Sequence, residues 1–232
     1  MPVARFIKTT LQDWEGKNAC MILLQGCNLR CPFCNHPELI DVTDEGGIDI
    51  PSILKYIKEN RDFLDAVVIS GGETTSSPEL YPLLKDIKSL KLKIKVDTNG
   101  TRPDILDDLI GAKLIDKVCM NILAPLNDSD YSKAAGITVD TALIRKSIEV
   151  LSRSDIKFEF RVTAVPDLIG HEAFLQISKT LVGQNSLIIQ QFDPKMTLNP
   201  EYRKMRPYPT PVLVRMAETA KQYIKHVRVR GI

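Results

Sequence analysis

Three cysteines lie close together near the start of the sequence, at positions 27, 31 and 34, in the order C-x3-C-x2-C. Thiolates at such short spacing are soft ligands, which suit zinc or an iron–sulfur cluster. A four-iron cluster held by Cys27, Cys31 and Cys34 leaves one iron free to bind another molecule. A structural zinc site, with His36 or a distant cysteine as the fourth ligand, uses the same residues. The spacing therefore predicts a metal centre of one of these two kinds.

The two other cysteines, Cys20 and Cys119, lie within apolar segments. A free cysteine among apolar residues behaves as a small hydrophobic side chain, so we interpret both as buried structural residues. The first residues of the chain lack the basic region and apolar stretch of a secretory signal, which favours a reducing, cytoplasmic location. Disulfides are not expected in that compartment.

The composition is typical of a globular protein. The chain has 232 residues, of which 44% are hydrophobic and 26% charged, and this length predicts a single domain spanning residues 1–232. The formal net charge of +2 argues against binding of nucleic acid or membranes through bulk charge. We interpret the lysine-rich run 85–95 as a solvated face rather than an RNA-binding surface. No apolar run approaches the ~18 residues of a membrane span, so no membrane partner is expected.

Strand and helix signals alternate along the chain and define the elements that must position the cysteines. Short apolar runs rich in β-branched residues predict strands at residues 20–24, 66–70, 92–97, 115–120, 158–165 and 187–191. Apolar stripes and capping residues predict helices after Pro51, from Ser77 and Pro78, at 103–111, around 141–151 and 171–181, and from Thr210. Six strand–helix units imply parallel strands joined by right-handed crossovers.

The predicted strand 158–165 favours an incomplete barrel over an open sheet. Its period of two places Glu159, Arg161 and Thr163 on one face. A parallel sheet covered by helices has no solvated outer face, so a polar face on a central strand indicates an interior cavity. In either fold the chemistry belongs at the carboxyl ends of the strands, where the cysteine loop follows the first strand.

The cysteine loop resembles the signature of the radical S-adenosylmethionine (SAM) superfamily, in which an aromatic residue, here Phe33, precedes the last cysteine. Gly71-Gly72-Glu73, after the second strand, matches the GGE segment that binds the SAM amino group in that superfamily. Asp97-Thr98-Asn99-Gly100, after the third strand, resembles the DTNG segment of glycyl radical enzyme activases. Together with segments 190–192 and 227–231, these motifs resemble the anaerobic ribonucleoside-triphosphate reductase activating proteins over nearly the whole chain.

The resemblance implies an α/β fold, a partial (β/α)6 barrel with parallel strands and outer helices. It implies a [4Fe-4S] cluster on Cys27, Cys31 and Cys34 that reductively cleaves SAM to a 5′-deoxyadenosyl radical, which then forms a glycyl radical on a partner. The expected partner is an anaerobic ribonucleotide reductase, with flavodoxin or ferredoxin as the reductant. The residues expected at the cofactors are Phe33, Asn35, His36, Gly71, Gly72, Glu73, Asp97, Thr98, Asn99, Arg161 and Gln191.

Two features leave alternatives open. The activases usually carry Met-Asp-Ile-Lys where this chain has Met120-Asn121-Ile122-Leu123. This departure weakens the expectation of a monovalent cation beside Asp97.

The long connection 192–209 carries basic and tyrosine residues. It is interpreted either as a docking or lid loop or as a flexible connection without such a role. The rival functions are radical modification of RNA or a small molecule, and a zinc-stabilised binding module without turnover.

Overall fold

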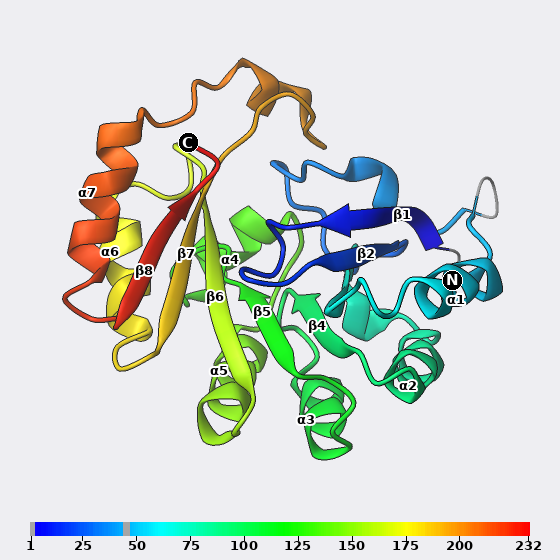
Figure 1. Ribbon diagram of the computed structural model, residues 1–232. Coiled ribbons are helices and arrows are strands. Elements are labelled where there is room, and N and C mark those ends of the chain that lie inside the picture. The colour runs from blue at the N-terminus through cyan, green and yellow to red at the C-terminus, as the bar shows by residue number, and fades with distance from the viewer. Residues whose placement is uncertain (1–2, 44–46) are drawn as a thin grey trace.

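The computed structural model describes residues 3–43 and 47–232, which form one eight-stranded sheet with helices on its outer side (Figure 1). The strands lie side by side in chain order, from β1 to β8. β1 is antiparallel to β2, and the strands from β2 to β8 are parallel. The sheet curls without closing, so β1 and β8 are its two ends. This arrangement confirms the predicted partial barrel of parallel strands with outer helices.

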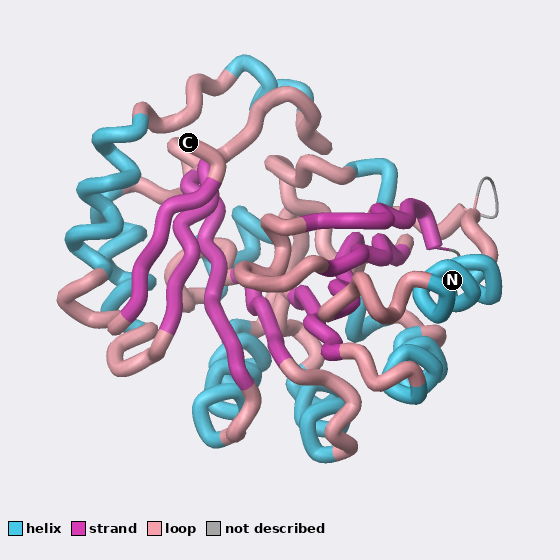
Figure 2. Tube along the Cα trace, viewed as in Figure 1, coloured by secondary structure: helices cyan, strands magenta, loops and turns pink. Residues whose placement is uncertain are grey.

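The elements follow one another as Figure 2 shows. The strands are β1 (Val3–Thr10), β2 (Ala19–Leu24), β3 (Ala66–Gly71), β4 (Lys93–Thr98), β5 (Lys117–Asn121), β6 (Lys157–Ala164), β7 (Ser186–Gln191) and β8 (His226–Arg230). The α-helices are α1 (Ile50–Glu59), α2 (Leu80–Ser89), α3 (Pro103–Gly111), α4 (Asp128–Ala135), α5 (Thr141–Arg153), α6 (His171–Thr180) and α7 (Thr210–Ala220). Three short 3-10 helices are η1 (Pro37–Leu39), η2 (Thr74–Ser76) and η3 (Pro200–Lys204).

All six predicted strands are present within a few residues of their expected ends, but the sequence did not reveal β1, α4 and β8. α4 buries only Tyr131, Ala134 and Ala135, which is too little to make an apolar stripe. β1 and β8 are edge strands whose residues are mostly only partly buried. Edge strands carry polar residues on both faces, so their hydrophobic pattern is weak.

The helix expected from Ser77 and Pro78 begins later, because α2 starts at Leu80. Residues 74–76 form the 3-10 helix η2 instead. Pro82 then falls in the first turn of α2, where a backbone N–H has no acceptor inside the helix. The missing N–H of this proline therefore costs the helix no hydrogen bond.

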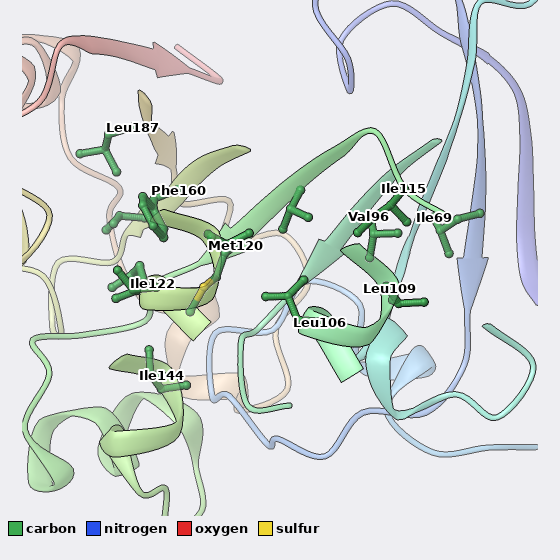
Figure 3. Packing of buried hydrophobic residues seen from close by; sticks show 14 of the residues in the cluster. Ile69, Val96, Leu106, Leu109, Ile115, Met120, Ile122, Ile144, Phe160 and Leu187 are labelled. Atoms are coloured by element: carbon green, nitrogen blue, oxygen red, sulfur yellow. The ribbon is translucent and has the colours of Figure 1, made fainter. Parts of the chain in front are cut away.

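The hydrophobic core lies between the sheet and the helices that cover it. Figure 3 shows Val96, Met120 and Phe160 of the strands clustered with Leu106 and Ile144 of α3 and α5. All five are essentially inaccessible to solvent, and such burial is the main force that holds helices on a sheet. Cys20 and Cys119 are also fully buried, as predicted. None of the helices in the described ranges is long and apolar enough to cross a lipid bilayer.

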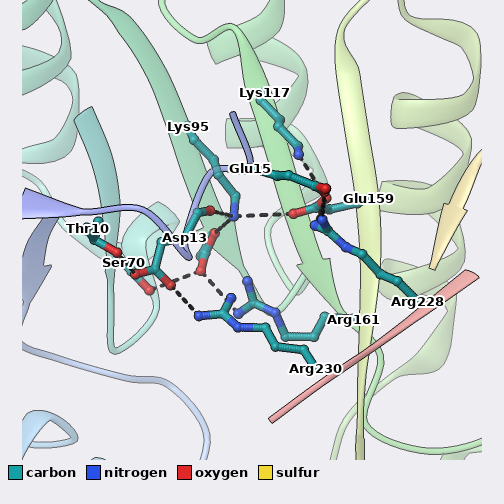
Figure 4. A network of polar contacts seen from close by, with 11 residues as sticks. Thr10, Asp13, Glu15, Ser70, Lys95, Lys117, Glu159, Arg161, Arg228 and Arg230 are labelled. Atoms are coloured by element: carbon teal, nitrogen blue, oxygen red, sulfur yellow. Dashed lines mark hydrogen bonds and ion pairs between the residues drawn. The ribbon is translucent and has the colours of Figure 1, made fainter. Parts of the chain in front are cut away.

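The inner face of the barrel is polar, as the alternation in β6 predicts. Lys95 of β4 is inaccessible to solvent and Glu159 of β6 is only 3% exposed, although charged residues are rarely buried unless they are paired. The Lys95 ammonium lies 3.3 Å from carboxylate oxygens of both Asp97 and Glu159. These ion pairs allow charged side chains to fill the interior of the barrel (Figure 4).

Ion pairs also connect the two ends of the sheet. Asp13, in the loop between β1 and β2, accepts a hydrogen bond of 2.8 Å from Arg230 of β8, and Glu15 of the same loop pairs with Arg228. Figure 4 shows both arginines reaching from β8 towards this loop. We call residues 11–18 the closing loop, because its side chains join the first and last strands.

Candidate active site

A cavity of about 930 Å³ lies inside the barrel and extends to the carboxyl ends of the strands. Its lining includes the whole set of residues that the sequence assigned to a metal or cofactor. They are Cys27, Cys31, Phe33, Cys34, Asn35, His36, Gly71, Gly72, Glu73, Asp97, Thr98, Asn99, Arg161 and Gln191. The fold therefore brings five separate chain segments together around one volume, although the role of each residue stays a prediction.

The cysteine loop directly follows β2 and is fixed to two other segments by backbone hydrogen bonds. The amide of Cys27 donates to the carbonyl of Ile40 over 2.9 Å, and the amide of Arg30 donates to the carbonyl of Ala135 over 2.8 Å. Gly136, with φ of +70°, ends α4 so close to Arg30 that an added Cβ would overlap its carbonyl oxygen. α4, the helix that the sequence did not reveal, thus acts as a support for the cysteine loop.

The surroundings of the three thiols in this loop make their ionisation to thiolates unfavourable. Burial raises the pKa of Cys27 to about 11, and burial likewise raises the pKa values of Cys31 and Cys34. The thiols also raise one another's pKa values where they face each other. A bound metal cation reverses this preference, because a coordinated thiol is deprotonated. The three partly buried cysteines are therefore expected to be protonated when no cation is bound, and as thiolates they would be soft metal ligands.

The thiols need not surround a single ion for this purpose. In a four-iron cluster each cysteine binds a different iron atom. Within residues 3–43 and 47–232, no three His, Cys, Asp or Glu side chains gather around the position of one ion. The donor set of three cysteine thiols beside an open polar cavity is the set that a [4Fe-4S] cluster with one free iron uses.

The paired glycines at the end of β3 are required by the chain itself. An added Cβ at Gly71 would overlap the backbone of Leu24, and one at Gly72 would overlap the carbonyl of Gly26. Gly71 also has φ of +118°, a conformation that other residues rarely adopt. The structure shows close approach of these glycines to the end of β2 and the start of the cysteine loop, and their predicted contact with SAM stays a prediction.

Glu73 connects the end of β3 to the loop after β4. Its side chain is 1% exposed and accepts hydrogen bonds of 2.6 Å from the Thr98 hydroxyl and from the Asn99 amide. The amide of Thr75 donates to the same carboxylate over 3.0 Å. Burial raises the pKa of Glu73 above its ordinary value, although these hydrogen bonds act in the opposite direction. The carboxylate thus positions two neighbouring loops, and its predicted contact with an amino group stays a prediction.

A chain of amide hydrogen bonds extends this connection to the cysteine loop. Asn99 Nδ2 donates to Asn28 Oδ1 over 2.9 Å, and Asn28 Nδ2 donates to the Thr101 hydroxyl over 2.8 Å. The amide and hydroxyl of Thr101 donate in turn to Asn99 Oδ1, at 3.0 and 2.6 Å. Asn28 and Thr101 were not predicted as site residues. Their sole sequence signal was proximity, since Asn28 follows the first cluster cysteine and Thr101 follows the DTNG segment.

Asp97 lies between two buried cations. Its Oδ1 is 3.3 Å from the Lys95 ammonium, and its Oδ2 is 3.2 Å from Arg161 Nη1. Burial alone would raise the pKa of Asp97, but the charges of Lys95 and Arg161 outweigh it and hold the pKa below its ordinary value. Lys95 was not predicted to be at the site. A monovalent cation beside Asp97 would have to share this carboxylate with both side chains, and it stays a prediction.

The remaining predicted residues lie at the mouth of the cavity. His36 Nδ1 is 3.1 Å from Glu38 Oε1. Gln191 Nε2 donates to the Tyr208 carbonyl over 2.7 Å. Phe33 packs against a small cluster that includes the buried residues Phe192 and Tyr202. Gln191 and Phe192 thus connect the end of β7 to the long connection that follows it.

That connection, residues 192–209, is folded rather than extended. It contains η3 and buries Thr197 completely. The amide of Asn199 donates to the carbonyl of Pro32 over 2.9 Å, which fixes the connection directly to the cysteine loop. The segment therefore packs against one side of the cysteine loop, and its role as a lid or docking element stays a prediction.

Comparison with protein families identifies the class to which this arrangement belongs. The family model of the radical SAM superfamily matches residues 21–175, a span that includes the cysteine loop, the paired glycines and the loop after β4. This chain belongs to the radical SAM superfamily. Membership implies a [4Fe-4S] cluster and SAM as cofactors, so it favours the cluster over the zinc site that the cysteines alone left open.

Individual relatives are consistent with this membership. A protein of Methanocaldococcus jannaschii named "Putative glycyl-radical enzyme activating enzyme" is 30% identical over 99% of this chain and 96% of its own length. A 7-carboxy-7-deazaguanine synthase of Aquifex aeolicus is 33% identical over 37% of this chain and 38% of its own. The crystal structure of Streptococcus suis SuiB bound to S-adenosylmethionine superposes with a TM-score of 0.66 at 19% identity. The superposition covers 91% of this chain and 52% of SuiB, so this chain spans about half the length of SuiB. The likeness shows that the two proteins share a fold.

Proposed function

We propose that this radical SAM enzyme is an activase that installs a glycyl radical on a partner protein. A [4Fe-4S] cluster, when bound, supplies the electron that breaks the sulfur–C5′ bond of SAM. One electron from an external reductant and one SAM then give methionine and a 5′-deoxyadenosyl radical. This radical takes a hydrogen atom from a glycine of the partner and leaves 5′-deoxyadenosine and a glycyl radical.

The chain's own residues hold, orient and enclose the reactants in this proposal. Cys27, Cys31 and Cys34 hold the cluster. Arg161 contributes two buried donors, Nε and Nη2, that have no hydrogen-bond partner among the described residues. Buried donors without a partner are costly, and a guanidinium suits a carboxylate. We therefore assign Arg161 to the carboxylate of the bound SAM, which is its one anionic group.

The remaining lining residues are assigned to enclose SAM and to keep water away from the reaction. They are Phe33, Asn35, His36, Gly71, Gly72, Glu73, Asp97, Thr98, Asn99 and Gln191. The hydrogen bonds of Glu73 and Asn99 fix three of the surrounding loops relative to one another. Such preorganisation is how a protein directs a reactive intermediate to one target.

The observation that carries the activase assignment is the match to a glycyl radical enzyme activating protein over 99% of this chain. The deazaguanine synthase match covers little more than a third of the chain, so it supports the shared chemistry more than a shared substrate. As partner we propose an anaerobic ribonucleotide reductase, and as reductant a flavodoxin or ferredoxin. The folded connection 192–209 is the proposed docking element, because it lies against the cysteine loop.

The chemistry is tested by reconstituting the protein anaerobically with iron and sulfide, then adding dithionite and SAM. Mass spectrometry should detect 5′-deoxyadenosine, and Cys31→Ala should abolish both its formation and most of the bound iron. Cys20→Ala is the matched control, because Cys20 is fully buried in β2 and outside the cavity lining. A Cys31→Ala variant that still cleaved SAM would contradict the assigned ligands.

The partner is tested separately by electron paramagnetic resonance. The reconstituted enzyme, SAM and an anaerobic ribonucleotide reductase should together give the signal of a glycyl radical, with one 5′-deoxyadenosine for each radical formed. If SAM cleavage were stimulated by RNA or by a small molecule and never by the reductase, the rival hypothesis of RNA or small-molecule modification would replace the activase.

A further inference from the structure

A second cavity lies at the opposite end of the strands from the cysteines. It has a volume of about 550 Å³, within the range of small-molecule sites. Lys117, Ser186 and His226, the first residues of β5, β7 and β8, contribute to its wall. The other lining residues are Glu15, Glu159, Lys221, Lys225, Val227 and Arg228.

Positive charge exceeds negative charge around this cavity. Its lining contains four permanent cations, Lys117, Lys221, Lys225 and Arg228, and the two carboxylates of Glu15 and Glu159. Glu159 is already shared by three cations, because Lys117 lies 2.8 Å, Arg228 3.0 Å and Lys95 3.3 Å from its oxygens. Lys221 pairs with Glu218 over 2.7 Å, whereas Lys225 forms no ion pair with any of the described residues. The lining therefore keeps a small excess of positive charge, at Lys225 and beside the shared Glu159.

Glu15 offsets part of this charge from an exposed position. Its side chain is 76% exposed, whereas that of its partner Arg228 is 37% exposed. Figure 4 shows Glu15 lying over the guanidinium of Arg228, beside Glu159 and Lys117. Burial, and to a smaller extent the nearby charge of Arg230, lower the pKa of Arg228. An exposed ion pair contributes little stability, so an external anion can compete with Glu15.

We propose that this cavity binds a small polyanion carrying phosphate groups, which replaces the Glu15 carboxylate at Arg228. The forked guanidinium of Arg228 suits a phosphate, and the lysines add charge without demanding one geometry. A cavity of about 550 Å³ holds more than one phosphate group, which favours a diphosphate or a nucleotide. This binding site is independent of the proposed activase function.

Binding there would act on the closing loop. Glu15 and Arg228 line both cavities, so their ion pair is part of the partition between them. The same loop carries Asp13, whose backbone carbonyl accepts a hydrogen bond of 2.6 Å from Lys95, and Lys95 pairs with Asp97 in the lining of the cysteine cavity. When Glu15 is released from Arg228, the closing loop is free to move, and this loop also contacts the first cavity.

The proposal is tested by isothermal titration of the full chain with inorganic pyrophosphate at low ionic strength. We expect saturable binding with one site per chain. Glu15→Gln removes the competing carboxylate and should tighten binding about threefold, whereas a double Lys221→Gln, Lys225→Gln variant should weaken it about tenfold. Glu149→Gln and a double Lys58→Gln, Lys146→Gln variant are the matched controls, because these residues are exposed on α1 and α5 and carry the same changes of charge.

The site would be established if the dissociation constant for pyrophosphate fell in Glu15→Gln, rose in the double lysine variant and stayed unchanged in both controls. Equal shifts in the cavity variants and their controls would show binding by net charge alone and would overturn the proposal. Absence of saturable heat at millimolar pyrophosphate would also overturn it. The substituted lysines are exposed, so unchanged thermal unfolding of each variant separates lost binding from a lost fold.

Discussion

The side chain of Asn28 is the residue-scale connection between the cysteine loop and the loop after β4. It accepts from Asn99 and donates to Thr101. Asn28→Ala leaves buried partners without hydrogen bonds, so we expect a loss of about 1–3 kcal/mol in the free energy of unfolding. The loosened loop should also retain less iron after reconstitution, measured as iron per chain.

Asn60→Ala is the control for this prediction. Asn60 Nδ2 donates to the Tyr56 carbonyl at the end of α1, and Asn60 is outside the cavity lining. It should lose stability without losing iron. Equal iron loss in both variants would mean that general destabilisation, and not positioning of the cysteines, sets the iron content.

Asp97 predicts a pH dependence of stability at the same scale. Its pKa is held below the ordinary value by Lys95 and Arg161, so its ion pairs stabilise the fold above about pH 4 and are lost as the pH falls through its folded pKa. Asp97→Asn leaves two buried cations without this partner and should cost about 3–5 kcal/mol at neutral pH.

Chemical denaturation from neutral to acidic pH tests whether the stabilisation by Asp97 is lost on acidification, as predicted. The difference in unfolding free energy between the wild type and Asp97→Asn should stay constant down to about pH 5 and then narrow. A difference that grew on acidification would show that Asp97 is protonated in the folded protein.

Residue types at special spacing were predictable, whereas their hydrogen-bond partners were not. The cysteines stand out by spacing, Arg161 by strand periodicity and Glu73 by its resemblance to a family motif, and all of them line one cavity. Lys95 and Thr101 have ordinary surroundings in the sequence. Their role depends on strands that meet only in three dimensions, which no local pattern encodes.

At the scale of elements, the end of β3 lies against the end of β2 through two glycines. Gly72→Ala places a Cβ against the carbonyl of Gly26, so β3 and the cysteine loop must separate. Such a change in a packed backbone costs several kcal/mol. We expect a variant that is destabilised or insoluble and that binds little iron.

Gly111→Ala is the matched control for that substitution. Nothing lies within 4 Å of an added Cβ at Gly111, which ends α3. Alanine in a helix is favoured over glycine by up to about 1 kcal/mol. Thermal unfolding should therefore show opposite shifts for the two variants, and a stable Gly72→Ala would contradict the tight contact.

Elements that bury a strong apolar stripe or run were predictable from the sequence. Elements whose side chains mainly form ion pairs and hydrogen bonds were not. β3 and α2 bury continuous apolar surface. β8 alternates valines with arginines that face the interior ion pairs, and this pattern resembles a surface strand when its partners are unknown. The sequence therefore predicts the centre of the sheet better than its two ends.

At the scale of the whole molecule, the closing loop joins the two ends of the sheet by ion pairs. Asp13→Asn removes the pair with Arg230 and should loosen the end of the sheet at a cost of about 1 kcal/mol, less at high salt. Hydrogen exchange followed by mass spectrometry should show faster exchange in β8 and unchanged exchange in β4.

Asp107→Asn is the control, because Asp107 pairs with Arg153 on the surface away from the closing loop. Its exchange in β8 should match the wild type. Equal exchange in β8 for Asp13→Asn would mean that pairing with β7 alone holds the last strand.

The hydrogen bond between Pro32 and Asn199 has a consequence for synthesis of the protein. The cysteines leave the ribosome roughly 170 residues before Asn199, which at about 5–20 residues per second is a delay of roughly 10–30 seconds. During that time the thiols lack the cover that residues 192–209 provide. Thiol labelling of nascent chains of increasing length should find Cys31 protected only after Asn199 has emerged, so the cysteines stay accessible to metal until the chain is nearly complete.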